Sequence, residues 1–432
     1  MINGKSGIKQ GGSGRAERRR LAFSLAAILT VVGGCEGLLD VSLPGDLTDA
    51  DLSDPRLANT LVLSTQGEFE CAFASYVWSM GLWAGDFHTS GNLRTNVLVA
   101  NRLADAWKQV TPIETECTNS NPPPLWLPLQ IAREVAEDAI ERFQAYPEGA
   151  VSNSDFLIAK ASLYAAYSRQ LLSETFCEIT FEAGPILTRA QGFESAVERF
   201  TQAIEHAERI TSGPHAEEAR YILNAAHVGR ARAKLNLGDA AGVVADASQV
   251  EEGFVANVTR SETDPRRWNH LQNQTHIVKG ITVTESYRDL TVDGVPDPRV
   301  VVTHEGFGQD GATPLWVQHK MPTRDAPMPF ASWREAQLMI AEVEGGQTAV
   351  DIINRLRDTY DLPHFSSTDP DAIRAQVIEE RRRELWLHGT RLGDMLRLGL
   401  PFLTGVDPRG GPYGDRTCLP FPVIEEIGNP NF

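Results

Sequence analysis

Residues 131–143 read Ile-Ala-Arg-Glu-Val-Ala-Glu-Asp-Ala-Ile-Glu-Arg-Phe, and this stretch decides the fold class. Apolar side chains recur every four residues, at Ile131, Val135, Ala139 and Phe143, and charged side chains fill most of the positions between them. A spacing of three to four residues places side chains on one face of an α-helix, whereas a strand would need strict alternation. The stretch therefore predicts an amphipathic helix whose apolar face packs against other helices.

Helical periodicity continues for more than a hundred residues, from about 127 to 250, with short turns between the helices. Small residues stand where these helices would cross, which is typical of tetratricopeptide-like hairpins, although the repeat is degenerate. We expect a helical half-bundle here and further helices at 332–343, 349–359 and 372–398. Residues 253–329 carry turns and short β-prone runs instead, and Val292-Asp-Gly-Val295 predicts a hairpin. The expected fold class is all-α, mainly helical, with tetratricopeptide-like helical hairpins supporting an irregular loop-rich half that has a few short strands.

The N-terminal segment predicts export. Three arginines at 18–20 precede an apolar run over 21–32, and Gly33-Gly34 leads directly into Cys35. These are the parts of a secretory signal. Twelve helical residues span about 18 Å, which is too short for a hydrocarbon core of about 30 Å. Val-Gly-Gly-Cys resembles a bacterial lipobox, so we expect cleavage of residues 1–34, a lipid on Cys35 and a tether over 35–54. The alternative is an ordinary secretion signal with an incidental cysteine.

Charge excludes one class of partner. The chain has 40 basic and 57 acidic residues, and removal of residues 1–34 would take away six basic and one acidic residue, which leaves a net charge of −22. A surface this acidic repels phosphate backbones, so we expect no nucleic-acid partner.

Four cysteines besides Cys35 leave the disulfide pattern open. Cys71, Cys117, Cys177 and Cys418 allow three pairings, of which Cys71 with Cys117 closes the shortest loop. Two disulfides and four buried thiols are both compatible with the sequence. None of these cysteines lies in a CxxC pair, and no histidine stands at ligand spacing from them, so we expect no metal site.

The C-terminal region carries the motif that points to a family. Residues 378–399 read Ile-Glu-Glu-Arg-Arg-Arg-Glu-Leu-Trp-Leu-His-Gly-Thr-Arg-Leu-Gly-Asp-Met-Leu-Arg-Leu-Gly. This run resembles the signature of SusD/RagB-like nutrient-uptake outer membrane lipoproteins, in which ERRxEL precedes Gly-x-Arg, an Asp and Arg-x-Gly. Other segments that resemble the family are 297–299 (Asp-Pro-Arg), 333–342, 352–357 and 419–431. Leu398 and His388 depart from the pattern, since the family more often has tryptophan and an acidic residue there.

The resemblance implies a single SusD-like domain over 55–432. Its parts are tetratricopeptide-like repeats at about 127–250, an irregular ligand-side region at about 253–329, and the C-terminal helices and signature over 330–432. The resemblance also implies a lipid-anchored outer-membrane protein, facing the cell surface, that binds a glycan or peptide nutrient. It would act as the lid of a SusC-like TonB-dependent transporter. No reaction and no cofactor are implied, so we expect a binding protein and not an enzyme.

Candidate ligand contacts lie in the irregular region. Trp268 and Trp316 stand there among polar residues, with Asn269 and His270 directly after Trp268. Sugar rings stack through their C–H faces on exposed aromatic side chains, and binding residues concentrate on loops. We predict Trp268, Trp316, Asn269 and His270 as ligand-binding residues, and a core position for both tryptophans is the alternative.

Sequence motifs for catalysis are missing. The chain has no Gly-x-Ser-x-Gly, no His-Glu-x-x-His and no phosphate-binding Gly-rich loop. Within 372–398, the charges of Arg381, Glu384, Arg391 and Asp394 predict an ion-pair network that locks the C-terminal helix onto the repeats, with Arg381 and Glu384 able to pair at i, i+3. Two other functions stay open: a lipid-anchored tetratricopeptide-like scaffold of the cell envelope, and a glycan-degrading enzyme whose catalytic groups the sequence does not reveal.

Overall fold

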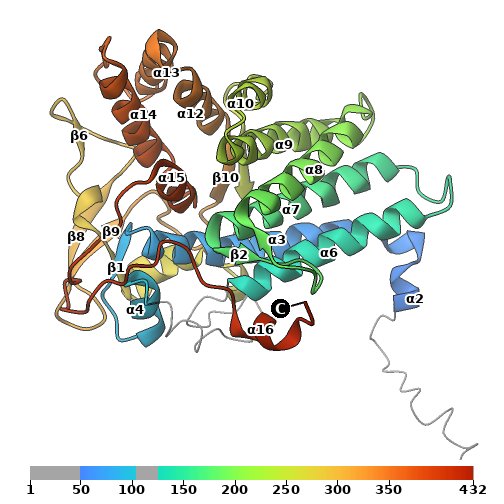
Figure 1. Ribbon diagram of the computed structural model, residues 1–432, viewed down its shortest axis with the longest axis horizontal. Helices are drawn as coiled ribbons and strands as arrows, with labels where there is room; N and C mark the ends of the chain where they lie inside the picture. The colour runs from blue at the N-terminus through green and yellow to red at the C-terminus, as the bar shows by residue number, and fades with distance from the viewer. Residues whose placement is uncertain (1–48, 104–124, 432) are drawn as a thin grey trace, which may run out of the picture. The chain divides into compact units, whose positions relative to one another are not determined.

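The computed structural model describes residues 49–103 and 125–431 of the chain (Figure 1). It divides into two units, Met1–Ser53 and Asp54–Phe432. The first unit contributes one described helix, α2 (Asp49–Leu52). All further description concerns the second unit. None of the described helices combines the length and the apolar character needed to cross a membrane.

A layer of long helices forms one half of the second unit, as the helical periodicity of the sequence predicts. α6 (Trp126–Ala145), α7 (Ser154–Thr175), α8 (Arg189–Glu208) and α9 (Ala216–Leu237) lie side by side in chain order (Figure 1). The longer helix α3 (Ala58–Trp83) packs against α6 and α7. This architecture confirms the expected all-α class with helical hairpins.

The end of α9 shows how local sequence sets a helix boundary. Gly238 follows the last helical residue with φ of 78°, a left-handed conformation that glycine adopts without a steric cost. The carboxylate of Asp239 then accepts a hydrogen bond of 2.9 Å from the N–H of Gly242. This N-cap starts the next helix, α10 (Ala240–Ala247).

Aromatic rings from α3, α7, α8 and the segment that contains Phe330 pack together in the core. The ring of Tyr167 in α7 meets Phe200 of α8 and Phe330 edge-on, with both pairs of centroids 4.9 Å apart. Gly229 of α9 makes room for these rings, because a Cβ atom there would lie 2.2 Å from Phe200. Phe69 of α3 adds a further ring 5.3 Å from Phe330.

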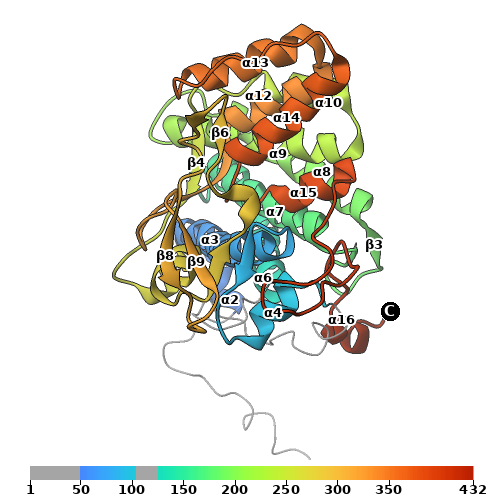
Figure 2. The same cartoon turned by 90° about the vertical axis from the view of Figure 1, so that its left-hand side faces the viewer.

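The C-terminal part of the chain forms a second group of helices. α12 (Trp333–Glu344) packs on α9 and α10 and also contacts α13 (Gly346–Asp358) and α14 (Pro370–Glu384), as Figure 2 shows from the side. The single helix expected over 372–398 is wrong, because α14 ends at Glu384 and α15 (Arg391–Leu398) begins after a turn. Gly389 in this turn has φ of 79° and lies so close to Tyr76 that a Cβ atom would stand 2.7 Å from the ring.

Short elements make up the irregular part. In chain order they are η1 (Pro55–Leu57), β1 (Phe87–Thr89), α4 (Arg94–Ala100), β2 (Glu178–Ile179), β3 (Leu187–Thr188), β4 (Val255–Val258), η2 (Pro265–Arg267), α11 (His270–Gln272), the π-helical turn η3 (Asn273–Ile277), β5 (Ile281–Val283), η4 (Glu285–Tyr287), β6 (Thr291–Val292), β7 (Val295–Pro296), β8 (Val302–Phe307), β9 (Pro314–Gln318), β10 (Met328–Ser332) and α16 (Val423–Gly428).

The strands of the described part pair in twos, all antiparallel: β1 with β5, β10 with β4, β2 with β3, β6 with β7, and β8 with β9. The predicted hairpin at 292–295 is confirmed, with Asp293 and Gly294 at φ of 48° and 85° in the turn. Among the short β-prone runs of this region, Asp297 to Val300 form a turn and β8 begins only at Val302.

The C-terminal segment returns to the helical layer. A disulfide joins Cys177, just after α7, to Cys418 across 241 positions of sequence. Backbone hydrogen bonds of 2.9 Å run from Cys177 N–H to Leu419 and from Leu419 N–H to Thr175. Cys71 is also disulfide-bonded, whereas Cys117 lies outside the described residues.

Candidate ligand-binding surface

Trp316 lies on an exposed hairpin. It is in β9 opposite His304 of β8, and the two rings lie 5.2 Å apart. The Trp316 N–H donates a hydrogen bond of 2.7 Å to Oγ1 of Thr282, which fixes the hairpin to β5. The indole is partly exposed, whereas its neighbours Leu315 and Val317 point inward and are buried. The hairpin therefore presents Trp316 from a rigid base.

A line of polar side chains begins at Trp316. The guanidinium carbon of Arg288 lies 4.8 Å from the centroid of the indole ring, in a cation–π contact. Arg288 also donates a hydrogen bond of 3.0 Å to Oε1 of Glu285 in η4. The side chain of Glu285 is 69% exposed, so this carboxylate faces solvent beside the indole.

Two further groups extend the line beyond Glu285. Oε2 of Glu285 lies 3.2 Å from Nε2 of His88 in β1, and Nδ1 of His88 lies 3.0 Å from the hydroxyl of Tyr413 in the C-terminal segment. We call Trp316, Arg288, Glu285, His88 and Tyr413 the Trp316 surface. Its members come from chain positions between 88 and 413, and the fold brings them together.

The protonation states of the Trp316 surface follow from its contacts. Burial lowers the pKa of His88, although Glu285 acts in the opposite direction. Burial alone would raise the pKa of Glu285, but hydrogen bonds from its own backbone N–H and from His88, with the charge of Arg288, lower it overall. An ionised carboxylate only accepts, so the neutral His88 ring donates from Nε2 and accepts from Tyr413 at Nδ1. Burial and Asp407 raise the pKa of Tyr413 to about 12, which keeps this phenol protonated.

Arg102 holds the segment that carries Tyr413. Its guanidinium donates to the backbone carbonyls of Arg416, Leu403 and Gly414 at 3.0, 2.6 and 2.7 Å. The same group lies 5.6 Å from the centroid of the Tyr413 ring. Arg102 therefore positions Tyr413 without belonging to the surface itself.

Trp268 has a separate environment. Its ring is partly exposed, and the guanidinium carbon of Arg324 lies 3.9 Å from its centroid. The indole Nε1 donates a hydrogen bond of 2.9 Å to the carbonyl of Glu262. The structure therefore gives the two predicted tryptophans different neighbours, and each has an arginine over one face.

Asn269 and His270 have internal roles, in contrast to the predicted ligand contacts. Asn269 is 0% exposed: Nδ2 donates 3.0 Å to the carbonyl of Ala326, and Oδ1 accepts from the N–H of Gln272 as the N-cap of α11. His270 is buried, and its burial lowers the pKa of the imidazole to about 4. Asn269 and His270 follow Trp268 in sequence but do not share its surface, because α11 begins at His270 and turns both side chains into the protein.

The predicted lipid attachment at Cys35 lies outside the described residues. Within 49–103 and 125–431, no three histidine, cysteine or acidic side chains converge as metal ligands would.

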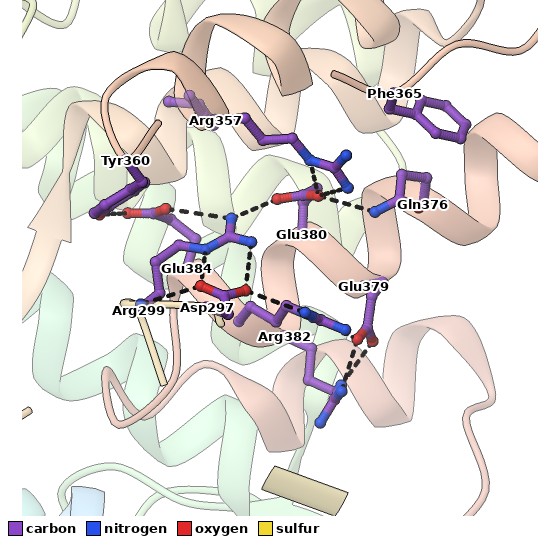
Figure 3. A network of polar contacts seen from close by, with 12 residues as sticks. Asp297, Arg299, Arg357, Tyr360, Phe365, Gln376, Glu379, Glu380, Arg382 and Glu384 are labelled. Atoms are coloured by element: carbon purple, nitrogen blue, oxygen red, sulfur yellow. Dashed lines mark hydrogen bonds and ion pairs between the residues drawn. The ribbon is translucent and has the colours of Figure 1, made fainter. Parts of the chain in front are cut away.

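The C-terminal signature forms a buried ion-pair network (Figure 3). Glu380 of α14 is 0% exposed and accepts from Arg357 of α13 at 2.5 Å and from Arg299 at 2.5 Å. Arg299 also pairs with Asp297 at 2.8 Å, so the Asp-Pro-Arg turn is tied to two helices. The hydroxyl of Tyr360 donates 3.0 Å to Glu384.

The predicted pairing of Arg381 with Glu384 is wrong, because Arg381 has other partners. Arg381 instead binds Asp394 of α15 at 2.7 Å and lies 3.5 Å from Glu342 of α12. Burial alone would raise the pKa of Asp394, but Arg381 and Arg397 lower it overall. A carboxylate held ionised in this way is a poor general acid, so the arrangement serves to fix helices together.

Comparison with known proteins identifies the fold. No protein-family model matches the chain, and no curated protein matches it. Solved structures do match. A SusD-like carbohydrate-binding protein from Bacteroides vulgatus aligns with a TM-score of 0.65 at 12% identity, over 88% of this chain and 97% of that chain. The chain has the SusD-like fold.

Other structures with the SusD-like fold align over similar lengths. A SusD superfamily protein from Bacteroides fragilis gives a TM-score of 0.60 at 15% identity, over 86% of this chain and 98% of that chain. Surface glycan-binding protein A from Bacteroides thetaiotaomicron, solved in complex with laminarihexaose, gives 0.61 at 12% identity, over 87% and 98%. The resemblance based on sequence motifs is thus confirmed at the level of the SusD-like fold.

Sequence reasoning missed most of the Trp316 surface. Arg288, Glu285 and Tyr413 stand in no motif, and His88 is about two hundred positions before Glu285. Within the SusD-like fold these groups meet through tertiary packing, which a single sequence does not display.

Proposed function

We propose that the protein binds a neutral oligosaccharide on the Trp316 surface. The likeness over nearly the full length of solved glycan-binding proteins with the SusD-like fold is the observation that carries the proposal. The chemistry of the surface supports it. A partly exposed indole offers an apolar face to sugar C–H groups, and Arg288, Glu285 and Tyr413 offer donors and acceptors for hydroxyl groups.

Affinity electrophoresis tests this proposal. Laminarin, amylose, xylan and mannan serve as the panel, and the wild-type protein should be retarded by at least one of them. Trp316→Ala should lose that retardation, and Trp268→Ala is the matched change at an indole with a similar arginine contact. If Trp268→Ala alone loses retardation, the binding surface lies at Trp268. If the wild-type protein is retarded by no polysaccharide of the panel but binds members of a peptide library, the oligosaccharide assignment is contradicted.

We propose no reaction. Glu285 is the exposed carboxylate of the surface, and its lowered pKa favours the ionised form, which accepts hydrogen bonds but does not donate a proton. Incubation with the retarding polysaccharide should produce no new reducing ends. Their appearance would instead support the glycan-degrading alternative.

We also propose that the protein is anchored by a lipid on Cys35 and acts as the lid of a SusC-like TonB-dependent transporter in the outer membrane. This rests on the lipobox and on the family resemblance of the sequence. Cys35→Ser should move the protein into the soluble fraction, whereas a membrane-bound variant would contradict the anchor. Tagged wild-type protein should retain a β-barrel partner in detergent, and repeated purification without one would contradict the lid.

A further inference from the structure

A polar groove lies away from the Trp316 surface, between α3, the start of α9 and β4. It consists of two adjoining cavities of about 330 Å³ and 570 Å³ that share Gln66 and Thr259 as lining residues. The smaller cavity is also lined by Leu63, Gly67, Glu70, Arg260, Arg266 and Arg267. The larger cavity is also lined by Tyr164, Glu217, Glu218 and Tyr221.

Tyr164 has a hydroxyl that is available to a ligand in this groove. The residue is only 4% exposed and lines the larger cavity, but its hydroxyl has no hydrogen-bond partner among residues 49–103 and 125–431. The buried hydroxyls of Tyr76 and Tyr167, in contrast, bind Glu174 at 3.0 Å and the carbonyl of Ala225 at 2.7 Å. The hydroxyl is not among the fully enclosed polar atoms of the described residues, so it reaches the larger cavity and is free to bind a group that enters there.

Oriented polar groups line the groove beside Tyr164. Glu70 is only 6% exposed and accepts from Nε2 of Gln66 at 2.9 Å and from Oγ1 of Thr259 at 2.8 Å. These bonds fix the amide and the hydroxyl that the two cavities share. Leu63 is 60% exposed at the rim and offers an apolar contact.

The guanidinium groups in the groove are paired. Arg260 and Arg267 of the smaller cavity lie 3.5 and 3.8 Å from Oε2 of Glu70, and Arg266 lies 3.5 Å from Asp264. Glu217 and Glu218 line the larger cavity. Glu218 is also paired with Lys160 at 2.5 Å. A lining whose guanidinium groups are already paired favours a neutral ligand over a phosphate. Aromatic, amide and hydroxyl groups together suit a polyhydroxylic molecule.

We propose that this groove is a second saccharide site, independent of the Trp316 surface. The class of ligand is the one given by the proposed function, and the location rests on Tyr164 and the groove alone. Two sites built from different residues would let one protein hold two segments of a polysaccharide, which strengthens retention by increasing the effective concentration of the second segment.

Gly67 provides a sharp test. It lies in the middle of α3 and lines the smaller cavity, and a Cβ atom added there would meet no other atom within 4 Å, so the helix accepts a side chain at this position. Gly67→Trp places an indole at the smaller cavity, and Gly67→Ala is the matched control that also removes the glycine from the helix but leaves that cavity open. Titration calorimetry with laminarihexaose, maltoheptaose, xylohexaose and mannohexaose should show two bound molecules of at least one of them per wild-type chain, one for Gly67→Trp and two for Gly67→Ala.

Trp316→Ala separates the two proposals. It should also bind one molecule, and the double variant with Gly67→Trp should bind none. If Gly67→Trp changes the binding of no member of the panel, or if Gly67→Ala reduces binding as much, the second site is overturned. If Gly67→Trp abolishes all binding and Trp316→Ala changes none, the groove is supported and the Trp316 surface is rejected.

Tyr164→Phe removes only the hydroxyl. Binding that remains in Trp316→Ala should become about fivefold weaker when Tyr164→Phe is added, as expected for one neutral hydrogen bond. Unchanged affinity in that background would contradict the role of Tyr164.

Discussion

Gly229 illustrates how single residues set the spacing of the helices. Gly229→Ala would bring a Cβ atom to 2.2 Å from Phe200 and 2.9 Å from Tyr167, both buried in the core. Because this crowding forces rings or helices apart, we expect the free energy of unfolding to fall by about 1–3 kcal/mol. Urea denaturation measures it. Gly67→Ala, at a helical position with open space, should raise stability by about 0.5–1 kcal/mol, and equal losses in both variants would contradict the packing argument.

His270 gives the protein a pH dependence. An unfolded imidazole takes its proton near pH 6.5, whereas burial lowers the pKa of folded His270 to about 4. Between these values the unfolded chain binds more protons, so stability is lost as the pH falls. The contribution reaches up to about 3 kcal/mol at pH 4.

His270→Leu should therefore show a shallower decrease in the free energy of unfolding between pH 7 and pH 4. Urea denaturation at several pH values measures the slope. His364→Gln, at an exposed histidine, controls for the loss of an imidazole. The same slope in His270→Leu and the wild type would contradict the assignment.

Among the elements, α14 is held by buried ion pairs. Glu380 is enclosed and binds Arg299 and Arg357. Glu380→Gln would leave two buried guanidinium groups without this carboxylate, so we expect a loss of about 3–5 kcal/mol in unfolding free energy. Asp138→Asn, which breaks the half-exposed pair of Asp138 with Arg142 in α6, should cost less than about 1 kcal/mol. Similar losses at both sites would show that burial does not set the strength of the network.

The elements also show what a sequence can predict. The end of α9 at Gly238 and the hairpin at 292–295 are predictable because they depend on the backbone preferences of adjacent residues. The break between α14 and α15 is not, because it depends on the approach of Gly389 to Tyr76, which is more than three hundred positions away. Asn269 shows the same limit: the side chain of Trp268 before it is partly exposed, whereas the amide of Asn269 binds the carbonyl of Ala326 inside the protein.

At the scale of the whole molecule, the disulfide joins distant parts of the chain. Replacing both Cys177 and Cys418 with serine should reduce the free energy of unfolding by about 2–5 kcal/mol, since the bond closes a loop of 241 positions. Urea denaturation under non-reducing conditions measures the loss. Tyr413 lies five residues before Cys418, so oligosaccharide binding on the Trp316 surface should weaken as well. A double-serine variant with wild-type stability would contradict the structural role of this bond.

The fold was accessible from sequence, whereas the proposed binding surface was not. Ordered motifs near the C-terminus indicated the SusD-like fold, which the solved structures confirm. Of the predicted contacts, Trp316 lies in a polar surface, but its partners come from β1, η4 and the C-terminal segment. Such groups are identified only once the folded chain is known.

The return of the C-terminal segment has a consequence for synthesis. Ribosomes make α3 to α9 before Tyr413 and before Thr417, whose carbonyl accepts a hydrogen bond from Trp83 in α3. A chain terminated early, just after α15, would contain the long helices but not the phenol that completes the surface. Binding at the proposed surface would then distinguish molecules that contain the C-terminal segment from truncated ones that a helical signal alone would count as folded.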